Sequence, residues 1–152
     1  MRATRRPLLV LTLAALATGT LLVGAAPAAG APRAPVVISF EKQFNEDATD
    51  DNGGIPTWTG TVPGGTLEVR LLDGWASGPV EHLVLDFILA GPFTFTARVR
   101  GTFNPATERT ALNGTVTSGM FEGARVHEEG LRVDAATSRF VGTIRIMRGS
   151  AA

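Results

Sequence analysis

Apolar or small residues alternate with polar residues without a break over the eleven residues from 93 to 103, FTFTARVRGTF. A repeat of two is typical of a β-strand with one buried face, because successive side chains of a strand point to opposite faces. A single strand is not stable in water, so neighbouring strands must cover its apolar face. The pattern therefore predicts a protein organised around a β-sheet.

A five-residue pattern recurs along the chain: an apolar residue, any residue, Gly, Thr and a second apolar residue. Its four copies are 58–62, 99–103, 112–116 and 140–144. In a strand the Gly of each copy shares a face with the two apolar residues, and it leaves a notch there that has no Cβ. Such notches allow a strand to bend sharply or to be crossed closely by a neighbour, as closed sheets require.

Further strands are predicted from alternation and from the turn residues between them. Two loops share the pattern [ND]-x-A-T-x-R, at 104–109 and 134–139, and each is expected to join two antiparallel strands. The segment 45–56 is expected to be an acidic loop, and 73–79 a second loop that carries Trp75. The remaining strands are expected at 36–44, 57–62, 66–72, 81–89, 120–128 and 131–133.

These elements amount to about eight strands with short connections. We expect an all-β domain over residues 36–148, folded as an antiparallel up-and-down barrel, because closure removes the unpaired edges of a sheet. A β-sandwich is the alternative. No helical repeat is found after residue 35.

The N-terminal segment has the features of a signal peptide. Arg2, Arg5 and Arg6 precede the apolar run 8–23, and Ala26-Pro27-Ala28 matches a cleavage site. We expect residues 1–28 to be removed on export, leaving an Ala/Pro-rich leader at 29–35 and a secreted protein with no membrane span. The general and the twin-arginine export routes both fit the signal. The chain has no Cys, so no disulfide supports the domain.

Basic and acidic side chains balance, with 14 of each. This charge density is far below that of a nucleic-acid binder, so no nucleic-acid partner is expected. The sequence makes no prediction of the oligomeric state.

Part of the chain resembles a known barrel family. The strand at 99–103 is followed by 112–124, LNGTVTSGMFEGA, in which a Gly-Thr strand leads into a G-x-F-x-G-A segment. This glycine pattern resembles that of allene oxide cyclase and dirigent-like barrels. The resemblance covers about 45 residues and implies an eight-stranded barrel with an apolar central cavity. It carries over no catalytic residue.

Few residues carry chemistry. There is no Cys or Tyr, only two His, and no G-x-S-x-G elbow. The acidic segment suggests calcium, but its spacing does not match the calcium-loop pattern, so a solvated loop is preferred. We expect no metal, no cofactor and no catalytic residue. Carboxylates such as Glu68 or Asp86 could still act as acid or base if they were buried in the barrel.

The sequence thus predicts a secreted barrel that binds a small apolar ligand or an anionic component of the cell envelope. The alternative is a small cyclase- or isomerase-like enzyme that acts inside the barrel, so enzymatic activity is left open, with a binding role preferred. A pocket is expected to open near Trp75; the alternative is that Trp75 plugs the end of the barrel. The candidate cavity residues are Trp58, Trp75, Phe87, Phe93 and Phe95. The candidate basic patch, for an anionic polymer, consists of Arg98, Arg100, Arg139 and Arg145.

Overall fold

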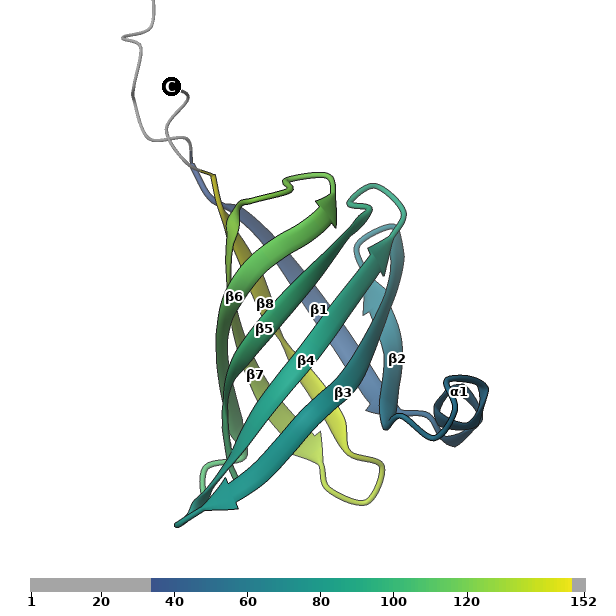
Figure 1. Ribbon diagram of the computed structural model, residues 1–152, viewed down its shortest axis with the longest axis vertical. Helices are drawn as coiled ribbons and strands as arrows, with labels where there is room; N and C mark the ends of the chain where they lie inside the picture. The colour runs from purple at the N-terminus through teal and green to yellow at the C-terminus, as the bar shows by residue number, and fades with distance from the viewer. Residues whose placement is uncertain (1–33, 149–152) are drawn as a thin grey trace, which may run out of the picture.

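A computed structural model describes residues 34–148 of the chain. It is a closed barrel in which eight antiparallel strands pair in sequence order, and β1 pairs with β8 to close the ring (Figure 1). The up-and-down barrel expected from the sequence is confirmed. The strands are β1 (Val36–Phe44), β2 (Thr57–Val62), β3 (Gly65–Ser77), β4 (Val80–Ala90), β5 (Phe95–Asn104), β6 (Arg109–Gly119), β7 (Arg125–Asp134) and β8 (Arg139–Met147).

The alternation read from the sequence places the core inside the barrel. On β5, Phe95, Ala97, Val99 and Phe103 are buried, whereas Arg98 is exposed. The same inward positions on the other strands supply one continuous apolar core. Burial of this face is what holds the disulfide-free domain together.

The four repeated glycines lie where neighbouring strands come very close. A Cβ on Gly101 would overlap the carbonyl oxygen of Ala111 and would lie 2.8 Å from the Cα of Leu112. Gly60, Gly114 and Gly142 are crowded by a partner strand's backbone in the same way. The glycines therefore allow the strong coiling that a barrel of this size needs.

The structure differs from the sequence prediction in three segments. The acidic stretch contains a short helix, α1 (Glu46–Asp51), where a loop was expected. β3 continues through Trp75 to Ser77, so the expected loop at 73–79 is only the turn between β3 and β4. Residues 120–124, expected to be part of a strand, form a turn before β7.

The two ends of the barrel are different. One end, called here the α1 end, carries α1, the two [ND]-x-A-T-x-R turns and the tip of the β3–β4 hairpin, which projects beyond the barrel (Figure 1). At the opposite end the ring of Phe121 packs against Phe95 and Phe93, with centroids 6.0 and 6.5 Å away. The end opposite α1 therefore contains a cluster of three aromatic rings.

The expected signal peptide, and nearly all of the leader, lie outside the described residues. Within residues 34–148, no helix has the length and apolar character needed to cross a membrane.

Candidate functional site

The barrel interior contains a cavity of about 130 Å³ at the α1 end. We call it the lumenal pocket. Its inner wall is formed by side chains that are buried: Lys42, Leu85, Phe103, Thr110 and Phe140. Its rim is formed by side chains that reach solvent: Trp58, Leu71, Glu81, Leu83, Arg132 and Ser138.

Lys42 is the unusual member of the inner wall. It lies on the inward face of β1, in phase with Ile38 and Phe40, and only 4% of it is exposed. Its Nζ lies 4.7 Å from the ring centroid of Phe87 and 5.4 Å from those of Phe40 and Phe140. Burial lowers the pKa of the Lys42 ammonium, and the nearby Glu128 carboxylate opposes that shift.

Glu128 is the buried acid beside the pocket. It projects inward from β7 and is completely buried. The Thr110 hydroxyl donates a hydrogen bond of 3.0 Å to Glu128 Oε1, whereas Oε2 has no hydrogen-bond partner among residues 34–148. Burial raises the pKa of Glu128, and the charge on Lys42 and the Thr110 hydrogen bond oppose this rise. A carboxyl group with one unpaired buried oxygen is costly to the fold, which is typical of a functional position.

The rim of the lumenal pocket combines the aromatic ring of Trp58 with a charged side chain, Arg132, that is fixed by an ion pair. Arg132 lies with its guanidinium 4.7 Å from the ring centroid of Phe103, and it forms a two-bond ion pair with Glu108. Trp58 donates from Nε1 to the Ser138 hydroxyl at 3.2 Å. These contacts fix the side chains through which a ligand would have to pass.

A second hollow, of about 290 Å³, lies on the projecting β3–β4 hairpin. We call it the shelf. It shares Leu71, Glu81 and Leu83 with the lumenal pocket and adds Gly74, Trp75 and Ala76. Gly74 and Ala76 have little or no side chain, which leaves room above the hairpin. The shelf and the lumenal pocket are therefore two compartments that meet at one boundary.

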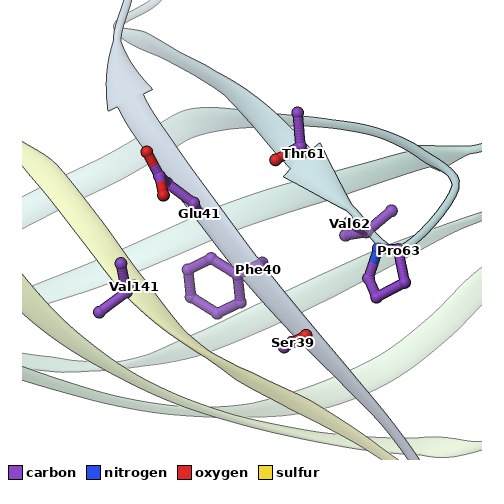
Figure 2. Close-up of a pocket in the computed structure, with 7 residues that line it drawn as sticks. All are labelled: Ser39, Phe40, Glu41, Thr61, Val62, Pro63 and Val141. Atoms are coloured by element: carbon purple, nitrogen blue, oxygen red, sulfur yellow. The ribbon is translucent and has the colours of Figure 1, made fainter.

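Two other hollows are more open. One, of about 370 Å³, lies over β1 beside the end of β2 and is lined by side chains such as Ser39, Glu41 and Thr61 (Figure 2). Another, of about 480 Å³, lies beside α1 and is mostly polar. Both are less enclosed than the lumenal pocket.

The structure does not bring the five candidate cavity residues together. Trp58 lies on the rim of the lumenal pocket, and Trp75 borders the shelf, 52% exposed and stacked on His82 with centroids 5.0 Å apart. Phe87 is buried in the core under Lys42. Phe93 and Phe95 lie at the opposite end, against Phe121.

The four arginines of the candidate basic patch also lie apart. Arg98 and Arg100 are on β5, whereas Arg139 and Arg145 are on β8, with β6 and β7 between them. Arg98 is paired with Asp86, and Arg139 with Glu41. Two separate pairs of arginines, each with one member already neutralised, take the place of a single patch.

The carboxylates considered as lumenal acids lie on the outside of the barrel. Glu68 pairs with Arg70, and Asp86 pairs with Arg98. The acid inside the barrel is Glu128, which the sequence prediction missed together with Lys42, Thr110 and Arg132. The signal for Lys42 was available in the sequence, because Lys42 continues the inward phase of Ile38 and Phe40 along β1.

No group of three or more His, Asp or Glu side chains within residues 34–148 is arranged to hold a metal ion. The acidic segment once considered for calcium is instead α1, which Asn45 caps by accepting a hydrogen bond from the Ala48 amide.

Comparison with known proteins gave no assignment: no protein-family model matches the chain, and no curated protein matches it either.

Proposed function

We propose that this protein is an exported barrel that binds a small apolar molecule in the lumenal pocket and on the adjoining shelf. The observation that carries the proposal is the pocket itself, a partly enclosed space with a carbon-rich wall at one end of the barrel interior. Ligand sites are typically concave, mostly apolar and furnished with a few polar groups. Here Lys42, Thr110 and Arg132 supply those groups.

The size of the pocket restricts the ligand. A cavity of about 150 Å³ holds one benzene molecule, so a pocket of about 130 Å³ takes at most one small ring or a short chain of a ligand. A larger ligand would place one end in the pocket and the rest on the shelf. Ligand sites commonly measure about 300–1,000 Å³, which the two compartments reach only together.

The resemblance to allene oxide cyclase and dirigent-like barrels supports a lumenal site of this kind. The alternative partner, an anionic polymer of the cell envelope, has less support because the four arginines lie apart and two are paired.

Binding is tested with the full chain and the fluorescent probe 1-anilinonaphthalene-8-sulfonate. We expect one saturable site in the native protein. Leu83→Phe places a larger side chain at the boundary of pocket and shelf and should weaken binding by about tenfold, which is about 1.4 kcal/mol. Val133→Phe is the matched control, because Val133 is exposed and lines neither compartment. Absence of saturable binding, or equal loss in both variants, would refute the proposal.

A second candidate function, a small cyclase- or isomerase-like enzyme, is favoured by the buried Glu128 with its raised pKa. Mass spectrometry of small molecules that co-purify with the protein distinguishes the two. A binding protein releases the molecule it took up, whereas an enzyme yields an isomer of it, and Glu128→Gln would stop the conversion while leaving probe binding intact.

A further inference from the structure

Lys42 is the only lysine in the chain, and every other basic side chain apart from two histidines is an arginine. Lysines are normally exposed, because their ammonium is strongly hydrated. This one lies inside the barrel between three phenylalanine rings. A buried lysine therefore needs an explanation, whereas a solvent-exposed one would not.

Burial makes the uncharged amine of Lys42 easier to reach than that of an exposed lysine. No carboxylate of residues 34–148 comes within 4.0 Å of its Nζ to form an ion pair. Glu128 is the buried acid near it, and burial favours the protonated form of that group. Burial likewise lowers the pKa of Lys42. A desolvated lysine with an available lone pair is the form that attacks carbonyl groups.

The pocket brings this amine to a ligand. Lys42 and Thr110 both belong to the inner wall, so a molecule that fills the pocket contacts both. The Thr110 hydroxyl is hydrogen-bonded to Glu128, which connects the pocket to a buried source of protons. Nucleophile, proton source and apolar space are therefore adjacent.

We infer that Lys42 captures a small apolar aldehyde in the lumenal pocket as an imine. This inference rests on the proposed function, and it names the class of ligand. The lone pair of Nζ forms a bond to the carbonyl carbon, and one amine proton moves to the carbonyl oxygen. The Thr110 hydroxyl then turns to give its own proton to the same oxygen and accepts the proton of Glu128 in its place. The C–O bond breaks, water leaves, and the nitrogen lone pair forms the C=N bond. The product is a protonated imine, and the Glu128 carboxylate balances its charge.

The experiment is reductive trapping with benzaldehyde, whose single ring suits the pocket. The full chain is incubated near neutral pH with benzaldehyde and cyanoborohydride, and the modified residue is located by peptide mass spectrometry. The sample contains only two kinds of amine, Lys42 and the chain's N-terminus. We expect one benzyl group on Lys42, incorporated about tenfold faster in the folded protein than in guanidinium chloride, where the amine has its ordinary pKa near 10.5.

Two variants act as controls. Lys42→Met has a similar length but no amine, and it should take up no benzyl group except at the N-terminus. Thr110→Val interrupts the contact with Glu128 and should slow trapping at Lys42. Leu83→Phe narrows the boundary between pocket and shelf, so it should slow trapping at Lys42 and also weaken probe binding.

Slower labelling of Lys42 in the folded protein than in the unfolded one would overturn the inference, because it would show an inert buried amine. If 1-anilinonaphthalene-8-sulfonate still bound at one site, the proposed binding function would stand even though imine formation at Lys42 had been excluded. Loss of probe binding to the native protein would instead remove the proposed function.

Discussion

The repeated glycines give the sharpest test of how this barrel is held closed. Replacing Gly101 by Ala adds one methyl group that overlaps the carbonyl oxygen of Ala111 and lies 2.8 Å from the Cα of Leu112. Both atoms belong to the backbone of β6, so no flexible side chain can move aside. The strands β5 and β6 must separate locally, which disturbs their hydrogen bonds. Overpacking of this kind costs about 1–3 kcal/mol.

Gly74 provides the matched control on β3. A Cβ there has its nearest neighbours at 3.6 Å, the carbonyl oxygen of His82 and the Cδ1 of Leu71, which is an ordinary contact distance. Gly74→Ala should therefore stabilise the protein by about 0.4–1 kcal/mol, because alanine restricts the unfolded chain more than glycine does. The same chemical change is thus expected to have opposite signs at two strand positions.

The free energy of unfolding is measured by urea titration, with the fluorescence of the two tryptophans as the signal, and the melting temperature by calorimetry. At roughly 4 °C per kcal/mol, Gly101→Ala should lower the melting temperature by about 4–12 °C and Gly74→Ala should raise it slightly. If Gly101→Ala melted at or above the wild-type temperature, the close approach of β5 and β6 would not be what excludes a side chain there.

Three further predictions follow from individual contacts. Burial raises the pKa of Glu128 above its usual 4.5, so the folded state keeps a proton that the unfolded chain releases, and this residue's contribution to stability falls as the pH rises above 4.5. The pKa of Lys42 is lowered from 10.5, so its contribution to stability rises with pH below 10.5, and the two residues must be separated by comparing variants. In urea titrations from pH 4.5 towards neutrality, the unfolding free energy of Glu128→Gln should increase relative to that of the wild type. A difference in unfolding free energy that does not change with pH would contradict the raised pKa of Glu128. Asn45→Ala removes the cap of α1 and the bond from Asn45 Nδ2 to Thr59, and should cost about 1–2 kcal/mol of unfolding free energy; an unchanged value would mean that α1 is not coupled to the barrel. Trp75→Ala should change the melting temperature by less than about 2 °C, since the ring is half exposed, but it should weaken probe binding on the shelf; a large loss of stability would show that Trp75 is a structural plug.

The barrel was predictable because its strands repeat one simple signal. The segment 93–103 alternates without a break, and the four Gly-Thr copies fall on four different strands. The helix α1 was missed because none of its six residues is buried, so it has no apolar repeat to detect. The extension of β3 was missed because Gly74 was taken for a turn residue, although it lies in a hairpin that pairs through Ser77.

The candidate site was harder to predict, because alternation gives the face of a residue but not its neighbours in space. Trp58 was placed at the pocket from its inward phase. Phe93 and Phe95 have a similar phase, yet they lie at the opposite end of the barrel, against Phe121. Lys42 and Glu128 face the interior through the same rule, but their separation of 86 positions in the sequence hides their association until the strand order is known.

The pairing of β1 with β8 has a consequence for the order in which the barrel can assemble. Val36 is paired with Ile146, so the ring stays open until nearly the whole domain is available. Before that moment β1 and β7 both present unpaired edges, which are prone to join other chains. Contacts between distant parts of a chain also form slowly, because a long loop must close first. The insertion of β8 therefore pairs two open edges in one event. It also places β1, which carries Lys42, beside β8, which carries Phe140, with the strand that carries Glu128 on the other side of β8.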